Sequence, residues 1–208
     1  MINKNNYKEL VEILREISNK ASKKILQIYN TDFDFTNKKD KSPLTQADLE
    51  SNRIICSFLK REFPKIPFIS EENVKKEIHN SKHFFLVDPL DGTREFLKRN
   101  GEFTVNICYL QNMRPTVSVI TVPTSKSQYF TDGTSSFKFE NGFTSKISSN
   151  VESKETRILV SRSHLDEKTK KLIKNIKNSK IMRVGSSLKF CLISEGKADL
   201  YIRYGKTI

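Results

Sequence analysis

The sequence predicts a mixed α/β (α+β) fold, because helical and strand-like patterns form separate blocks first and then alternate along the chain. Near the N-terminus, apolar residues recur at three-and-four spacing, which indicates helices. The middle of the chain carries short apolar runs separated by turn residues, which indicate strands. With 208 residues and 14 phenylalanines, the chain has enough apolar material for one large core or two subdomains that share an interface.

Two helices are expected before the first strand. The first spans 7–29, where a single apolar stripe consists of Tyr7, Leu10, Val11, Leu14, Ile17, Ala21, Ile25 and Ile28. The polar segment 31–43 lacks this period and ends in proline, so it is a loop or an irregular hairpin. The second helix begins at Thr45, where Asp48 three residues later resembles a capping arrangement, and it ends before Pro64.

Strands are expected from residue 84 onward. The first covers 84–87 and delivers Asp88 at its end, and further strands follow over 103–110, 116–122, 128–130 and 136–139. The mostly polar stretch 144–155 is the best candidate for a boundary. Beyond it, strands over 157–161, 181–184 and 198–204 alternate with helices over 166–176 and 187–195. We therefore expect an α+β subdomain over 1–150 and an α/β subdomain over 151–208.

The formal net charge is +13, from 37 lysines and arginines against 24 acidic residues. Such a charge attracts nucleic acid, an anionic membrane surface or an acidic small substrate. The lysines are spread along the chain, and the dense stretch 168–180 fits the solvated face of an amphipathic helix. Because no basic run is interleaved with aromatic residues, we expect a small-molecule partner and no nucleic acid.

The three cysteines lie far apart and show no pairing pattern or metal-ligand spacing, so Cys56, Cys108 and Cys191 are expected to be reduced and buried. No window is apolar enough for a membrane span, and the N-terminus has no signal-peptide pattern. We expect a cytoplasmic protein. The sequence leaves peripheral attachment to the inner membrane open and does not give the oligomeric state.

The segment from Asp88 to Thr93 is the strongest candidate for a functional site. Pro89 keeps Asp88 out of the helical region, so Asp88 and Asp91 are presented around a turn at the strand end. Gly92 allows the backbone to approach a ligand closely, and Thr93 opens a helix whose free N–H groups favour a phosphate. Cations and an anion would therefore be bound side by side.

Glu71 follows a short apolar run and would bring a third carboxylate to the end of a neighbouring strand. Oxygen ligands without histidine or cysteine select Mg²⁺, or Mn²⁺, over Zn²⁺.

For two other Asp residues, the residues alone favour a structural role over a functional one. Asp132 precedes a glycine between two strand-like runs and indicates only a hairpin turn. Asp48, judged from its spacing, is first of all a helix cap.

Three motifs resemble the inositol monophosphatase superfamily of metal-dependent phosphatases: 42–48 (SPLTQAD), 69–72 (ISEE) and 88–93 (DPLDGT). The continuation 94–107, with 161–164 (SRSH) and 185–191 (GSSLKFC), is similar to its 3'(2'),5'-bisphosphate nucleotidase (CysQ-like) branch. The resemblance covers nearly the whole chain. It implies a layered αβαβα sandwich and removal of the 3'-phosphate from adenosine 3',5'-bisphosphate.

The resemblance also implies roles for individual residues. Metal ligands would be Glu71, Asp88, Asp91 and the carbonyl of Leu90, holding two or three Mg²⁺ ions. Thr93 and Asp48 would form the pair that orients and deprotonates the attacking water. Residues around the nucleotide would be His164, Ser186, Lys189 and Arg203, with Gly92 and Thr93 beside the phosphate. From residue types alone, Lys189 is an ordinary surface lysine and His164 an ordinary loop histidine.

One departure from the family pattern affects these expectations. Family members carry a Trp-Asp motif, whose Asp binds a metal, shortly after the strand expected at 198–204. This sequence has no tryptophan and ends at Ile208, so we expect a C-terminally truncated chain with poor activity and marginal stability. An inositol or sugar-phosphate phosphatase is an alternative. So is an inactive remnant that only binds metal or nucleotide.

Overall fold

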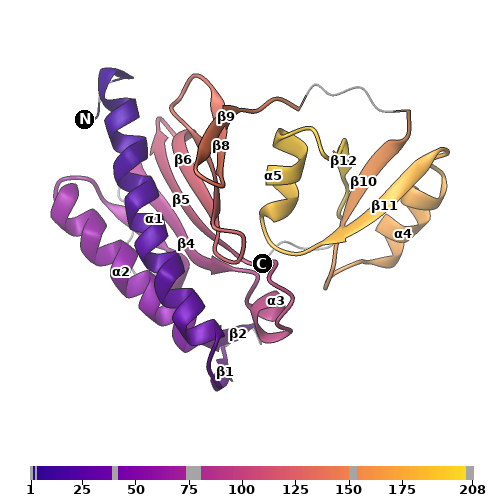
Figure 1. Cartoon of the computed structure of the whole chain (residues 1–208), viewed down its shortest axis with the longest axis horizontal. Coiled ribbons are helices and arrows are strands. Elements are labelled where there is room, and N and C mark those ends of the chain that lie inside the picture. Colours follow the sequence, from indigo (N-terminus) through magenta and orange to yellow (C-terminus); the bar gives the residue numbers. More distant parts are fainter. Residues whose placement is uncertain (1, 3, 39–41, 74–80, 150–153, 205–208) are drawn as a thin grey trace.

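Figure 1 shows the computed structural model, which describes residues 2, 4–38, 42–73, 81–149 and 154–204. After a short 3-10 turn, η1 (Lys4–Asn6), helices α1 (Tyr7–Tyr29) and α2 (Gln46–Glu62) lie side by side against one face of a large sheet. The predicted stripe of α1 is almost fully buried from Tyr7 to Ile25. Between the helices, β1 (Phe35–Asn37) and β2 (Pro43–Thr45) form an antiparallel pair, so the irregular hairpin is confirmed.

The large sheet has seven strands in the order of the chain. They are β3 (Phe68–Ser70), β4 (His83–Asp91), β5 (Thr104–Gln111), β6 (Arg114–Val122), β7 (Ser127–Thr131), β8 (Ser136–Glu140) and β9 (Phe143–Lys146). The first pair is parallel and all later pairs are antiparallel. Two short helical segments interrupt the run: η2 (Glu71–Asn73) after β3, and α3 (Thr93–Leu97) after β4.

A smaller parallel sheet has the order β11-β10-β12, with β10 (Thr156–Ser161) in the middle. Helix α4 (Glu167–Lys174) connects β10 to β11 (Ser179–Val184), and α5 (Leu188–Ser194) connects β11 to β12 (Leu200–Tyr201). This alternation of strand and helix agrees with the pattern that the sequence predicts for this half.

The elements stack in layers, and strand alternation shows how. On β6, Val117 and Val119 join the core under α1 and α2, whereas Val122 on the opposite face packs with Cys191 of α5. Helix α5 thus lies between the two sheets, and α4 covers the far side of the smaller one through Ile173 (Figure 1). The layered αβαβα architecture is confirmed.

Strands β4, β9 and β12 show the largest differences from the prediction. Strand β4 runs on through Asp91. It tolerates Pro89, which has no N–H to donate, because Pro89 falls where the pairing with β5 is irregular. The polar stretch after residue 143 contains β9, which the turn at Asn141 folds back onto β8; its residues are all exposed, so they show no alternation. Strand β12 is shorter than 198–204, because the Ala198 amide bonds back to α5.

The expected turn at Asp132 and the free state of the three cysteines are confirmed as well. Asp132 forms a hairpin turn, with its side chain accepting from the amides of Thr134 and Ser135. All three cysteines are free, but Cys108 is only half-buried, because it lies on the opposite face of β5 from the buried Ile107 and Tyr109. Within the described part of the chain, no helix combines the length and the apolar character that crossing a bilayer requires.

Candidate functional site

The carboxyl ends of β3 and β4 meet, because Ser70 pairs with Val87 in a parallel register. This places Glu71 and Asp88 beside one another, at the edge of a cavity of about 210 Å³. The cavity is lined by ten of the predicted site residues: Glu71, Asp88, Leu90, Asp91, Gly92, Thr93, His164, Ser186, Lys189 and Arg203. Residues from both sheets therefore contribute to a single site.

Asp88 has the environment of a cation ligand. Its Oδ1 atom is buried and has no hydrogen-bond partner among the residues that the structure describes. Burial, with the negative charges of Asp91 and Glu71, raises the pKa of Asp88 well above its ordinary value. An unpartnered buried oxygen beside two more carboxylates fits a hard divalent cation, which would relieve the repulsion.

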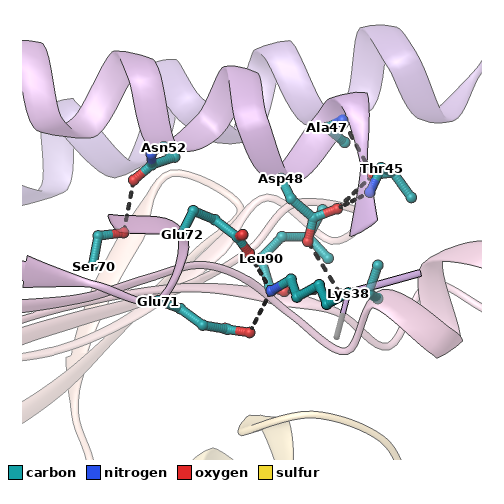
Figure 2. A network of polar contacts seen from close by, with 10 residues as sticks. Lys38, Thr45, Ala47, Asp48, Asn52, Ser70, Glu71, Glu72 and Leu90 are labelled. Carbon is teal, nitrogen blue, oxygen red and sulfur yellow. Dashed lines mark hydrogen bonds and ion pairs between the residues drawn. The ribbon is translucent and has the colours of Figure 1, made fainter. Parts of the chain in front are cut away.

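The carboxylates do not form a finished metal cage. Within the described ranges, no three Asp, Glu, His or Cys side chains converge closely enough to hold an ion as they stand. Glu71 is turned toward Lys38, whose Nζ lies 2.8 Å from Glu71 Oε1 and 2.5 Å from Glu72 Oε1 (Figure 2). Burial lowers the pKa of Lys38, but the hydrogen bonds to Glu71 and Glu72 outweigh it and raise the pKa, so the ammonium stays charged.

Asp48 is both a helix cap and a partner of Thr93. Its Oδ2 accepts from the Thr45 amide at 2.8 Å and the Thr45 hydroxyl at 2.6 Å, which completes a capping box (Figure 2). Its Oδ1 accepts from the Thr93 hydroxyl at 3.1 Å, and that hydroxyl also lies 3.4 Å from the Leu90 carbonyl. Burial raises the pKa of Asp48 although these hydrogen bonds oppose the shift.

The turn between β11 and α5 is tied to the acidic side of the cavity. The Ser187 amide donates to Asp91 Oδ2, and the Gly185 amide donates to Glu102 Oε2 at 2.7 Å. Burial raises the pKa of Asp91, and the Ser187 bond opposes this. Opposite this turn, Gly92 has φ +93, and a Cβ there would lie 2.9 Å from the Glu102 carbonyl oxygen. Glycine is therefore required at Gly92.

Basic side chains line the other side of the cavity. Lys189 is buried on α5 and donates to the Ser186 carbonyl; burial lowers its pKa, while Asp91 and Glu95 oppose the shift. His164 lies 2.8 Å from Arg94, measured from Nε2 to Nη1. Burial and the charges of Arg203 and Arg94 lower the pKa of His164.

Sequence reasoning missed Lys38, Arg94 and Glu95. Lys38 belongs to a polar segment without periodicity, in a chain where lysines are common, so nothing singles it out. Arg94 and Glu95 directly follow the DPLDGT motif, and their place next to it is the one signal that could have found them.

The layered scaffold, with carboxylates at strand ends facing basic groups across one cavity, defines a protein of the metal-dependent phosphatase class. The chain belongs to the inositol monophosphatase family, whose model matches residues 6–208. It is 41% identical to the 3'(2'),5'-bisphosphate nucleotidase CysQ of Buchnera aphidicola, over 98% of this chain and 78% of that protein. The CysQ of Salmonella typhimurium is 35% identical, over 95% of this chain and 82% of that protein.

Solved structures agree with this assignment. The crystal structure of CysQ from Bacteroides thetaiotaomicron, a bacterial member of the inositol monophosphatase family, superposes with a TM-score of 0.79 at 34% identity. The match covers 96% of this chain and 81% of that chain. An inositol monophosphatase from Thermotoga maritima, at 20% identity and a TM-score of 0.77 over 93% of this chain and 75% of its own, shares the fold.

Proposed function

We propose that this chain is a Mg²⁺-dependent 3'(2'),5'-bisphosphate nucleotidase that converts adenosine 3',5'-bisphosphate to AMP and phosphate. The observation that carries the proposal is the placement of acidic and basic groups on opposite sides of one cavity. Identities of 35–41% to proteins named as nucleotidases of this kind support the choice of substrate. Residues 1–150 would carry the cation side and residues 151–208 the nucleotide side.

In this proposal Glu71, Asp88, Asp91 and the Leu90 carbonyl hold the cations. Bound Mg²⁺, or Mn²⁺, would lower the pKa of the attacking water and offset charge on the transferred phosphate. The buried, unpartnered Oδ1 of Asp88 supports this assignment. Because Glu71 pairs with Lys38 in this structure, it would have to turn from Lys38 toward the cation to serve as a ligand.

Thr93 and Asp48 orient the water. Because the Thr93 hydroxyl donates to Asp48 Oδ1, its lone pairs face away from Asp48 and are left to accept a proton of the water. The proton then passes from Thr93 Oγ1 to Asp48 Oδ1, whose raised pKa favours taking it up. No protein nucleophile is required.

On the opposite side, His164, Ser186, Lys189 and Arg203 would bind the nucleotide, with the Gly92 backbone close to the reacting phosphate. The charge of Lys189 and Arg203 supports a substrate with a second phosphate, because one phosphate is already neutralised at the cation side.

A substrate panel tests the proposal. The purified protein is incubated with Mg²⁺ and adenosine 3',5'-bisphosphate, inositol 1-phosphate or fructose 1,6-bisphosphate, and released phosphate is measured. We expect the nucleotide to have the highest kcat/KM, with AMP as product. Preferred hydrolysis of inositol phosphate or sugar phosphate would contradict the choice of substrate while leaving the phosphatase class intact.

A further inference from the structure

We propose that Arg94, oriented by His164, determines specificity by binding the second phosphate of the substrate, the one that is not removed. This inference rests on the proposed nucleotidase function. It adds to the predicted nucleotide-binding set a residue that precedes the second sheet and lies on the short helix α3, immediately after Thr93.

The position of Arg94 is fixed across the cavity. Arg94 is exposed on α3 and lines the same cavity as Asp88 and Asp91. Its Nη1 atom lies 2.8 Å from Nε2 of His164, a residue on the loop after β10 and 70 residues away in sequence. The guanidinium therefore spans from the acidic side of the cavity, where α3 begins, to the nucleotide side.

The contact with Arg94 determines the protonation state of His164. A guanidinium only donates, so His164 Nε2 must accept and the imidazole must be neutral, with its proton on Nδ1. Burial and the nearby charges of Arg203 and Arg94 lower the pKa of His164, which agrees with the neutral form. His164 is thus an orienting acceptor. Arg94 has five N–H donors, and those not given to His164 remain for a phosphate, which guanidinium binds with two hydrogen bonds.

The balance of charge around the cavity favours a second anion at this place. Arg94, Lys189 and Arg203 line the cavity together with His164, and their charges, after burial, lower the pKa of His164. The acidic residue next to them is Glu95, a buried carboxylate that accepts from the Ser163 hydroxyl at 2.5 Å. Asp91 as well as Glu95 offsets the charge of Lys189. The positive charge near His164 that a phosphate would neutralise is therefore mainly that of Arg94 and Arg203.

The alternative is that Arg94 only fastens α3 to the loop after β10. Lys98 provides a matched control for that role, because its Nζ donates to the Ser163 hydroxyl at 2.9 Å and so ties the same two segments. Lys98 does not line the cavity. If fastening were the whole function of Arg94, removal of either side chain would have similar consequences.

The test compares Arg94→Ala, Arg94→Lys and Lys98→Ala on two substrates, adenosine 3',5'-bisphosphate and adenosine 3'-monophosphate. For Arg94→Ala we expect KM for the bisphosphate to rise about 10- to 100-fold, the size of a lost charge-assisted pair. KM for the monophosphate should change less than about two-fold. Arg94→Lys should recover part of the loss, because it restores the charge without the two-pronged geometry. Lys98→Ala should leave both substrates nearly unchanged.

An equal loss on both substrates in Arg94→Ala, or no loss on either, would overturn the role of Arg94 while the proposed function stands. A wild-type protein that hydrolyses neither nucleotide, but does hydrolyse inositol phosphate, would instead overturn the proposed function and this inference together.

Discussion

The hydroxyl of Thr93 donates to Asp48 Oδ1 at 3.1 Å, although 45 residues separate the two in sequence. The other carboxylate oxygen of Asp48 is held by the capping box at the start of α2. The capping box thus fixes the carboxylate, and its other oxygen, Oδ1, faces the first residue of α3. The pairing connects the helix layer to the end of β4, where the acidic residues lie.

Removal of the Thr93 hydroxyl tests the role of this pair. We expect Thr93→Ala to lower kcat about 100- to 10,000-fold, because general-base assistance to the water is lost, with little change in KM. Thr93→Ser keeps the hydroxyl and should retain most of the activity. Steady-state kinetics with adenosine 3',5'-bisphosphate measure both. Retention of more than about a tenth of kcat in Thr93→Ala would contradict the assignment.

Lys38 stabilises the acidic side through Glu71 and Glu72, and the Glu72 side chain is only 7% exposed. We expect Lys38→Met to lower the free energy of unfolding of the metal-free protein by about 2 kcal/mol, because Glu72 is left buried without its partner. Mg²⁺ should restore part of this loss by neutralising Glu71, the other carboxylate that Lys38 contacts. Thermal unfolding in EDTA and in MgCl₂ measures the effect.

Lys20→Met is the control, because Lys20 pairs with Glu16 on the exposed surface, where ion pairs contribute little. Equal melting temperatures for Lys38→Met and the wild type in EDTA would show that Lys38 has no such role.

A second buried charge ties α5 to the large sheet. Glu195 accepts from the Tyr129 hydroxyl at 2.8 Å and lies 3.1 Å from Lys138 Nζ, with its own side chain 7% exposed. We expect Glu195→Gln to reduce the free energy of unfolding by about 1–3 kcal/mol. Glu140 also pairs with Lys138 but is far more exposed, so Glu140→Gln should have a clearly smaller effect. Urea unfolding compares the two, and an equal loss would contradict this ranking.

The cysteines predict a pH dependence of labelling. Loss of solvation raises the pKa of Cys108 to about 11 and that of Cys191 to about 12. Because a raised thiol pKa means that the reactive thiolate forms only at higher pH, both should react slowly with iodoacetamide at pH 8 in the folded protein. Their labelling should accelerate as pH rises toward 11 and should be fast in urea. Mass mapping of the alkylated peptides checks this, and rapid labelling of folded Cys191 at pH 8 would contradict it.

Much of the fold follows from local sequence. The limits of α1 and the start of α2 are set by an apolar stripe and a capping box, both of which depend on neighbouring residues only. Strand β9 was missed because it is an edge strand with four exposed residues, which has no alternation to detect. The continuation of β4 past Pro89 depends on pairing with β5, and such pairing is not visible in a single segment.

The site shows the same division. Asp88, Asp91, Gly92 and Thr93 form one short motif, so their proximity could be predicted. Lys38 and Arg94 contact partners that lie 33 and 70 residues away, and only the fold brings these pairs together. The spacing of Asp48 predicts a helix cap, and the structure confirms the cap. The same carboxylate also contacts Thr93, so the cap is compatible with the proposed catalytic role.

In the proposed mechanism, the carboxylates of Glu71, Asp88 and Asp91 bind the divalent cations that activate water against a 3'-phosphate. The most direct test follows adenosine 3',5'-bisphosphate by ³¹P NMR with the wild type and Asp88→Asn, each with Mg²⁺ and with EDTA. We predict that the wild type with Mg²⁺ loses the 3'-phosphate resonance and forms AMP and inorganic phosphate, and that EDTA or Asp88→Asn abolishes this reaction. Hydrolysis that continues in EDTA, or at the wild-type rate in Asp88→Asn, would contradict the claim.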